Sequence, residues 1–148
     1  MDKVSSEASE MIKAFEGFVP YPYACVGGTL TIGYGTTGKD AERFTKDSPI
    51  TKAQAEELLL RDIKKIDAQL KQIVTVDLQQ RERDAIVSLV YNIGIGAFGK
   101  STLLRLLNAG DKLAAADQFD RWVFAGGKQS RGLKRRRAAE KRHFLGHK

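Results

Sequence analysis

The sequence predicts an α+β fold, in which a small β-hairpin subdomain near the start is followed by a mostly helical lobe, with a long helix joining the two. Apolar residues repeat at helical spacing through most of the chain beyond residue 51. A stretch rich in Gly and Pro, residues 18–38, breaks that spacing. With 148 residues, of which 42% are hydrophobic, the chain has the size of one globular domain. We expect a single domain over 1–148, with a β-containing subdomain at about 16–50 and a helical lobe at 51–148.

The first element expected is a helix over residues 6–15. Its apolar residues lie three or four positions apart, on one helical face: Ala8, Met11, Ile12 and Phe15. Gly17 follows and is a natural helix stop. A strand is expected next at 29–32, because polar and apolar residues alternate there.

The register of the hairpin that contains this strand is left open by the sequence. Gly27-Gly28 is a hairpin turn signal, and a strict two-residue turn there pairs Cys25 with Leu30 and puts Thr31 on the other face. A wider turn leaves Cys25 ahead of the regular strand. Only the wider turn lets Cys25 and Thr31 reach one cleft.

The rest of the chain is predicted to be helical. Thr51 to Gln54 has the form of a capping box and starts a long helix that runs to about Val74. Asp77 is a candidate cap for a second helix, which ends within Asn92–Gly96. Three further helices are expected at 101–108, at 111–119 and at 133–145.

The positive charge is concentrated at the end of the chain. The net charge is +7, and the segment from Lys128 to Lys148 holds nine Lys and Arg residues against one acid, Glu140. Such a segment favours an anionic partner, either nucleic acid, anionic lipid or an anionic cell wall. No nucleic-acid motif accompanies it. No apolar run approaches the roughly 20 residues of a membrane span, and the polar segment Met1–Glu10 does not resemble a secretory signal.

The sequence predicts neither a metal nor a cofactor. Cys25 is the single cysteine, and the two histidines, His143 and His147, stand at the end of the chain without a Cys/His cluster. The Gly-rich stretch over 33–38 lacks the lysine and the following helix of a phosphate loop.

Glu16 is the first candidate for chemistry. It closes the first predicted helix, where the partial negative charge of the helix end disfavours a carboxylate and favours the protonated form that a general acid needs. Taken alone, Glu16 is more typical of a solvated surface residue, as most glutamates are. Cys25 alone is typical of a small buried hydrophobe, and Thr31 alone of an ordinary strand residue.

Together, these three residues resemble a known pattern. Glu16, eight residues, Cys25, five residues and Thr31 is similar to the catalytic triad of phage-type lysozymes, glycoside hydrolase family 24, in which Glu is followed by Asp or Cys and then Thr. Blocks along nearly the whole chain carry the same resemblance: Phe15–Gly17, Leu30–Gly35, Leu89–Gly94, Phe98–Leu104, Trp122–Gly127 and Gly132–Glu140.

The resemblance implies a lysozyme-like fold and hydrolysis of the β-1,4 bond between N-acetylmuramic acid and N-acetylglucosamine in peptidoglycan, as in a phage endolysin. Glu16 is then the proton donor to the glycosidic oxygen, and Thr31 positions the attacking water. Cys25 assists the water or stabilises the cationic transition state. Many members have Asp at this place, which is charged at neutral pH, whereas an ordinary thiol is mostly protonated. The resemblance favours inversion at the anomeric carbon.

The resemblance also implies substrate-binding residues. Tyr91 and Ser101 match positions near the family's sugar-binding cleft, although a core aromatic and a helix cap are the alternatives for them. Arg136 is expected to reach across the cleft and pair with Glu16, while the bland alternative for the basic helix is a solvated face.

The expected partners are peptidoglycan glycan strands and, through the basic terminal helix, an anionic cell-wall or outer-membrane surface. A monomer without a transmembrane segment is expected, held in the host cytoplasm until a holin gives access to the wall. The sequence leaves two alternative functions open. One is a lytic transglycosylase that acts on the same bond, and the other is a basic nucleic-acid-binding helical module. A membrane-disrupting terminal helix is a third, weakened by the lack of a broad apolar face.

Overall fold

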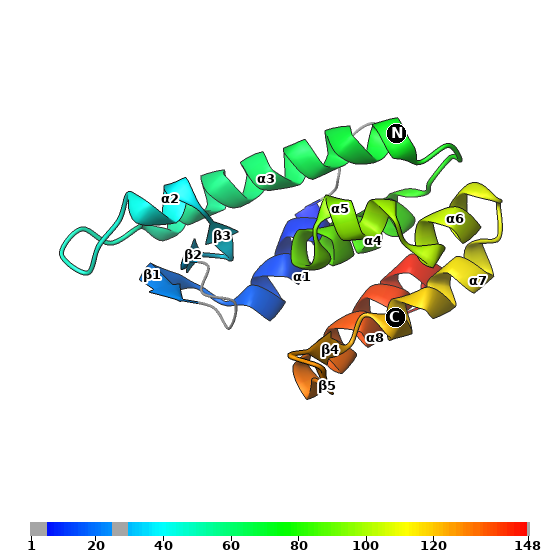
Figure 1. Cartoon of the computed structure of the whole chain (residues 1–148). Helices are drawn as coiled ribbons and strands as arrows, with labels where there is room; N and C mark the ends of the chain where they lie inside the picture. Colours follow the sequence, from blue (N-terminus) through cyan, green and yellow to red (C-terminus); the bar gives the residue numbers. More distant parts are fainter. Residues whose placement is uncertain (1–5, 25–29, 148) are drawn as a thin grey trace. The chain divides into compact units, whose positions relative to one another are not determined.

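The computed structural model describes residues 6–24 and 30–147 and confirms the α+β fold (Figure 1). The chain divides into two compact units. We call Ser9–Lys64 the sheet unit, and Met1–Ala8 with Lys65–Lys148 the helical unit. Each is described by itself below.

The sheet unit contains most of α1 (Ser6–Glu16) and a three-stranded antiparallel sheet in the order β1-β2-β3. The strands are β1 (Val19–Ala24), β2 (Leu30–Gly33) and β3 (Thr36–Thr37). A short helix, α2 (Lys39–Glu42), follows them. The first half of α3 (Lys52–Ile73) completes the unit.

The register of the sheet answers the question that the sequence left open. Ala24 pairs with Leu30 and Tyr23 with Thr31, so the pairing of Cys25 with Leu30 is wrong. Gly-Gly permits a tight turn without enforcing one, and the register is decided by which β2 side chains become buried. The connection between the paired residues, 25–29, includes Cys25 and lies outside the described residues.

The core of the sheet unit forms between β2 and the helices. Ile32 is fully buried against Ala41 of α2, Ile50 and Ala55 of α3. Gly33 has a positive φ of 65°, and a Cβ atom there would lie 2.9 Å from the Ala55 Cβ. Glycine at this position therefore lets the end of β2 approach α3 closely.

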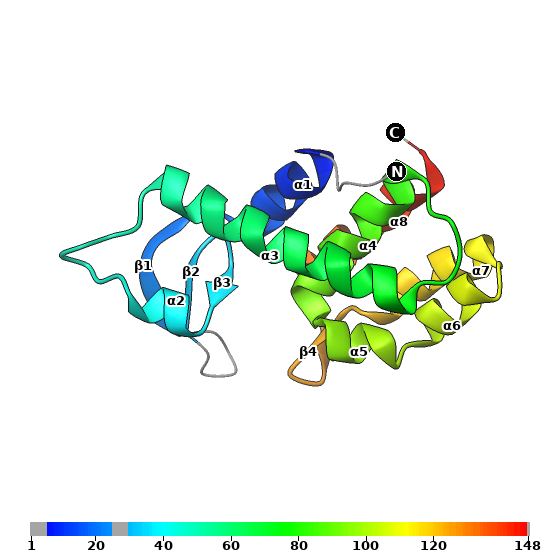
Figure 2. The ribbon, with the colours of Figure 1, turned by 90° about the horizontal axis from the view of Figure 1, so that it is seen from above.

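Helix α3 is the long helix that the sequence predicts, and it begins in the sheet unit and ends in the helical unit (Figure 2). Its capping box is confirmed, because the Thr51 amide donates to Gln54 Oε1 at 2.9 Å and the Gln54 amide to Thr51 Oγ1 at 3.1 Å. Within the described part of the chain, no helix is both long and apolar enough to cross a membrane.

The helical unit is built around α4 (Gln80–Ile93), which packs along α8 (Arg131–Leu145) (Figure 1). Both faces of α4 are covered, since its residues 82–90 are all buried. The other elements are α5 (Ile95–Gly99), α6 (Thr102–Asn108), α7 (Lys112–Asp117), a 3-10 helix (Gln118–Arg121), and the hairpin strands β4 (Phe124–Ala125) and β5 (Lys128–Gln129).

Local capping signals predict most helix starts in this unit, with one error. Ser101 and Asp111, the first residues of two of the expected helices, cap α6 and α7 by accepting from the amides of Leu104 and Ala114. Asp77 does not cap α4. Gln79 is the cap, in a reciprocal capping box with Glu82, and this pair satisfies two backbone donors where Asp77 would satisfy one.

Candidate active site

Glu16 is the last residue of α1, as the sequence predicts, and it is half-buried. The helix stops because Gly17 takes a positive φ of 70° and its amide donates to the Lys13 carbonyl at 3.0 Å. The carboxyl group therefore stands at the carbonyl end of the helix. The chain passes directly from there into β1.

The last turn of α1 is fixed to the sheet unit just before Glu16. Lys13 Nζ donates to Glu56 Oε1 of α3 at 2.6 Å and lies 5.5 Å from the centre of the Tyr34 ring. The Glu56 carboxylate raises the pKa of the Lys13 ammonium above its ordinary value. This contact holds the helix end in place relative to the sheet, so the backbone of Glu16 has a defined position.

Thr31 lies in β2 and is 3% exposed. Successive side chains in a strand point to opposite faces, and the neighbouring Ile32 enters the apolar core described above. Thr31 is therefore buried on the face of the sheet opposite to that core.

The strand pairing keeps the triad positions within one unit. Val19, three residues after Glu16, pairs with Gly33, and Tyr23 pairs with Thr31. Cys25 follows Ala24, the β1 residue that pairs with the neighbour of Thr31, and lies outside the described residues. Glu16 and Thr31 thus both belong to the sheet unit.

Arg136 belongs to the helical unit and is buried, with 4% exposed. Its Nε donates to Glu140 Oε2 at 3.2 Å and its Nη2 to the Ser88 carbonyl of α4 at 3.1 Å. These two contacts fix the plane of the guanidinium. Because Glu16 lies in the other unit, pairing between Arg136 and Glu16 stays a prediction.

Glu140 is the centre of a buried network that the sequence analysis missed. The side chain is fully buried, and it accepts from Ser88 Oγ at 2.5 Å as well as from Arg136 and Arg137. Arg137, 1% exposed, also donates to Asn92 Oδ1 and to the Trp122 carbonyl. The interpretation of the basic helix as a solvated face is therefore wrong for Arg136 and Arg137. Their spacing of four and three residues from Glu140 was the signal available in the sequence.

The two residues predicted to bind sugar lie in the helical unit. Tyr91 is half-buried on α4. Ser101 is buried, and its hydroxyl donates to the Phe98 carbonyl at 2.7 Å while accepting from the Leu104 amide at 3.1 Å. Ser101 also borders a pocket of about 480 Å³. That pocket is lined by Ala97, Lys100, Ser101, Thr102, Gln118, Arg121 and Trp122.

Comparisons with known proteins agree with this architecture. The phage lysozyme family model matches residues 13–140. A SAR-endolysin of Bacteriophage PS119 is 43% identical over 126 residues, which are 85% of this chain and 74% of that protein. An endolysin of Acyrthosiphon pisum secondary endosymbiont phage 1 is 41% identical over 145 residues, 95% of this chain and 97% of that protein. The chain belongs to the phage lysozyme family.

Solved structures give the same result. The muramidase domain of SpmX from Asticaccaulis excentricus has a TM-score of 0.86 at 36% identity, covering 98% of this chain and 99% of that one. As a member of the phage lysozyme family, the chain is an endolysin-type enzyme that degrades peptidoglycan. The matched range includes Glu16, Cys25, Thr31 and Arg136.

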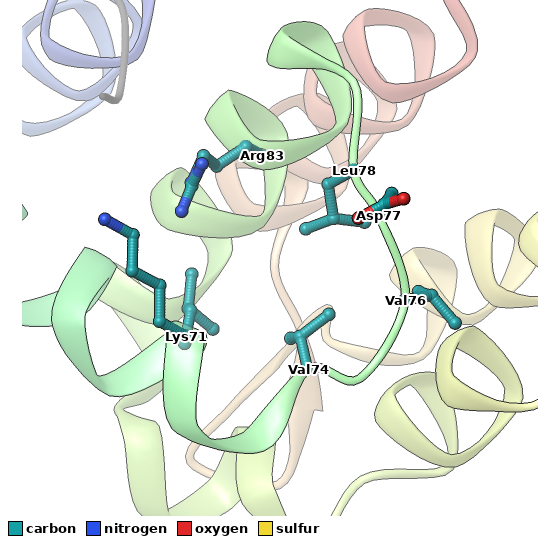
Figure 3. A pocket seen from close by; sticks show the side chains of 7 residues that line it. Lys71, Val74, Val76, Asp77, Leu78 and Arg83 are labelled. Carbon is teal, nitrogen blue, oxygen red and sulfur yellow. The ribbon is translucent and has the colours of Figure 1, made fainter. Parts of the chain in front are cut away.

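A second pocket of about 370 Å³ lies apart from these residues, between the end of α3 and the start of α4 (Figure 3). Leu70, Val74, Val76 and Leu78 give it an apolar lining, and Lys71, Asp77 and Arg83 complete it. Arg83 Nε donates to the buried Asp67 Oδ1 at 2.6 Å. The pocket contains none of the predicted site residues of this phage lysozyme family member.

Proposed function

We propose that the chain is a muramidase, which hydrolyses the β-1,4 bond between N-acetylmuramic acid and N-acetylglucosamine with Glu16, Cys25 and Thr31. The observation that carries the proposal is the position of Glu16, at the end of a helix that Lys13 anchors, in a chain of the phage lysozyme family. The buried Thr31 on β2 of the same unit supports it.

In the proposed reaction, Glu16 gives its proton to the glycosidic oxygen as the bond from that oxygen to the anomeric carbon breaks. Positive charge builds up on the sugar ring, and a water held by Thr31 attacks the anomeric carbon from the opposite face. The attacking water gives up a proton, either to the Cys25 thiolate or to solvent, and the product sugar has the inverted configuration. The Glu16 carboxylate then takes a proton from solvent, which restores the general acid for the next turnover.

Cys25 has two possible tasks in this scheme. As a thiolate, it accepts the proton of the water or stabilises the cationic sugar. As a neutral thiol, it only contributes a weak hydrogen bond that helps to orient the water. The two tasks differ in pH dependence, since only the first requires the thiol to ionise.

We infer further that Arg136 pairs with Glu16 in the working enzyme. Its guanidinium is held by Glu140 and the Ser88 carbonyl, so its orientation is set before substrate binds. For Ser101, the cap bonds occupy the hydroxyl. Its proposed contribution to substrate binding is therefore to shape the bordering pocket, with Tyr91 as the sugar contact.

The test of the proposal is the exchange Glu16→Gln, assayed by turbidity loss of chloroform-treated Gram-negative cells. We expect a folded variant with activity lowered by about 10²–10⁴-fold, the usual contribution of a positioned proton donor. Glu10→Gln is the matched control, because Glu10 lies on the same helix and its side chain is 68% exposed. A folded Glu16→Gln variant with more than about a tenth of the activity would contradict the assignment.

Product analysis distinguishes hydrolysis from transglycosylation. Mass spectrometry of the released muropeptides is expected to show reducing N-acetylmuramic acid ends, with the added mass of water. Anhydro ends would indicate a lytic transglycosylase, which cuts the same bond by an internal attack of the sugar. The proposal of a muramidase fails in that case, whereas the assignment of Glu16 as proton donor survives.

Two substitutions test Cys25. Cys25→Ser removes the ionisable thiol and should lower activity strongly, whereas Cys25→Asp introduces the other residue found in the family and should retain substantial activity. For a packed core residue the order reverses, because a buried aspartate destabilises the fold. Specific activities with a thermal melt for each variant decide between the two. An active serine variant beside an unfolded aspartate variant would remove Cys25 from the site.

Access to the wall is a separate part of the proposal. We propose that a holin opens the membrane for the enzyme and that exposed charges of α8 hold it at the anionic wall. Expression without a holin should then leave cells intact until the membrane is opened chemically. Lysis without any such treatment would show that the enzyme reaches the wall by another route.

A further inference from the structure

The helical unit brings together a histidine and two carboxylates that are not part of the predicted triad. Glu7 stands in the first turn of α1, Asp84 on α4 and His143 in the last turn of α8. One ligand atom of each lies within 4.8 Å of those of the other two. His143 Nε2 is 3.5 Å from Glu7 Oε2 and 3.6 Å from Asp84 Oδ2.

The imidazole nitrogen is in an unusual situation. Nε2 of His143 is buried and, among the described residues, has no hydrogen-bond partner. The two carboxylate oxygens face it at distances beyond the 2.7–3.2 Å typical of N–H···O bonds.

The separations suit ligands of one metal ion. In a tetrahedral zinc site with Zn–N and Zn–O bonds of about 2.0–2.2 Å, neighbouring ligand atoms lie about 3.4 Å apart. The nitrogen-to-oxygen separations of 3.5 and 3.6 Å are close to this value. A metal ion between the three atoms would give the buried Nε2 a partner that the described residues do not supply.

We propose that Glu7, Asp84 and His143 bind a divalent transition metal ion, with zinc as the preferred ion and solvent as the fourth ligand. An imidazole with two carboxylates is a zinc-type donor set, whereas magnesium and calcium are bound by oxygen ligands alone. Asp84 is 1% exposed, its Oδ1 accepts from Gln80 Nε2 at 3.1 Å, and its Oδ2 lies 3.6 Å from His143 Nε2. Such a contact orients a ligating carboxylate.

The site is independent of the glycosidase reaction. Glu7 and His143 lie outside residues 13–140, the range that the phage lysozyme family model matches. The ion would link the start of α1 to the end of α8, so its effect is on the stability of the helical unit. No local sequence pattern indicates this site, because Glu7 and Asp84 are far from His143 along the chain.

Isothermal titration of the full chain with Zn²⁺ at pH 7, in a buffer that does not chelate, tests the site. We expect the unchanged chain to bind one zinc ion and to have a higher Tm when zinc is present. Glu7→Gln and His143→Gln should each raise the dissociation constant for zinc at least about tenfold. Glu10→Gln and His147→Gln are the matched controls, one on the same helix and one at the same chain end. Both should bind zinc as the unchanged chain does.

The absorption spectrum with bound cobalt(II) is a second measurement, which distinguishes binding at this site from binding at Cys25. Four-coordinate Co²⁺ on nitrogen and oxygen ligands shows visible d–d bands without the near-ultraviolet sulfur-to-cobalt transition that a Cys25 ligand would cause. Absence of saturable zinc binding overturns the proposal and leaves an ion pair of His143 with the two carboxylates. Zinc binding that survives His143→Gln, or that shows a sulfur transition with cobalt, overturns it as well.

Discussion

At the scale of single residues, Glu140 is a carboxylate with no exposed surface in the described part of the chain. A fully buried carboxylate is costly unless charges and hydrogen bonds compensate it. Here Ser88, Arg136 and Arg137 all donate to its two oxygens. The same contacts orient Arg136, so one residue contributes both to the packing of α8 on α4 and to the proposed active site.

We expect Glu140→Gln to lower the free energy of unfolding by about 3–5 kcal/mol, because two buried guanidinium groups lose their counter-charge. Activity per folded molecule should fall too, since Arg136 loses its ion pair with Glu140 while its contact with the Ser88 carbonyl remains. Urea unfolding and the lysis assay measure the two effects. The control is Asp120→Asn, which removes an exposed partner of Lys141 and should cost at most about 1 kcal/mol. Equal losses in the two variants would contradict the argument.

At the scale of elements, the end of β2 depends on its approach to α3. Gly33→Ala introduces a Cβ that would lie 2.9 Å from the Ala55 Cβ, at a backbone φ of 65°. We expect a loss of about 2–4 kcal/mol, from the clash and the backbone strain together. Thermal and urea unfolding measure it.

Gly38→Ala is the control for Gly33→Ala. Gly38 has a comparable φ of 80°, but no atom lies within 4 Å of its added Cβ. This variant should lose only the strain contribution, about 1–2 kcal/mol. If the two alanine variants are equally destabilised, the close approach of β2 to α3 contributes nothing.

Helix α2 is joined to α3 by an ion pair between Asp40 Oδ2 and Arg61 Nη2, at 2.7 Å. The Arg61 guanidinium lowers the pKa of Asp40 below its ordinary value of 3.8. A lowered pKa in the folded state means that the pair stabilises above the unfolded-state value and that this contribution is lost as pH falls through the folded-state value. Acid should therefore weaken the attachment of α2 below about pH 4.

We expect Asp40→Asn to lower the free energy of unfolding at pH 7 by about 0.2–1 kcal/mol, since Arg61 is half exposed and such pairs contribute little. The difference in stability between the variant and the unchanged chain should be smaller at pH 2 than at pH 7, because Asp40 loses charge as pH falls. Urea unfolding at both values checks this. A difference that persists undiminished at pH 2 would show that Asp40 acts through something other than its charge.

At the scale of the whole molecule, the features that could be predicted from the sequence are those formed by residues close together in the chain. The capping box at Thr51, the cap at Ser101 and the end of α1 at Gly17 all involve residues within four positions of each other. The family resemblance placed Glu16 and Thr31 on the expected helix and strand. Contacts between distant segments could not be predicted from local sequence patterns. The burial of Arg137 and the contact of Glu7 with His143 were missed for this reason.

Because Arg136 and Arg137 are buried, they contribute less than exposed residues to any attraction between α8 and an anionic surface. Arg136 and Arg137 share the single negative charge of Glu140, and Lys141 is paired with Asp117 and Asp120. The charges of α8 that remain exposed toward solvent include Lys134, Arg135 and Arg142. Attraction to an anionic wall, a property of the summed field of the molecule, should therefore come from these exposed residues.

We expect the double variant Lys134→Gln with Arg135→Gln to slow lysis at low salt and to match the unchanged chain at high salt. Screening acts over about 10 Å at 0.1 M salt and about 3 Å at 1 M, so the contribution of exposed charge disappears as salt rises. Lysis rates across a salt series measure it. Lys64→Gln with Lys65→Gln is the control, because these exposed α3 residues change the net charge equally. If the control follows the same salt profile, net charge alone steers the enzyme, and α8 has no special part in reaching the wall.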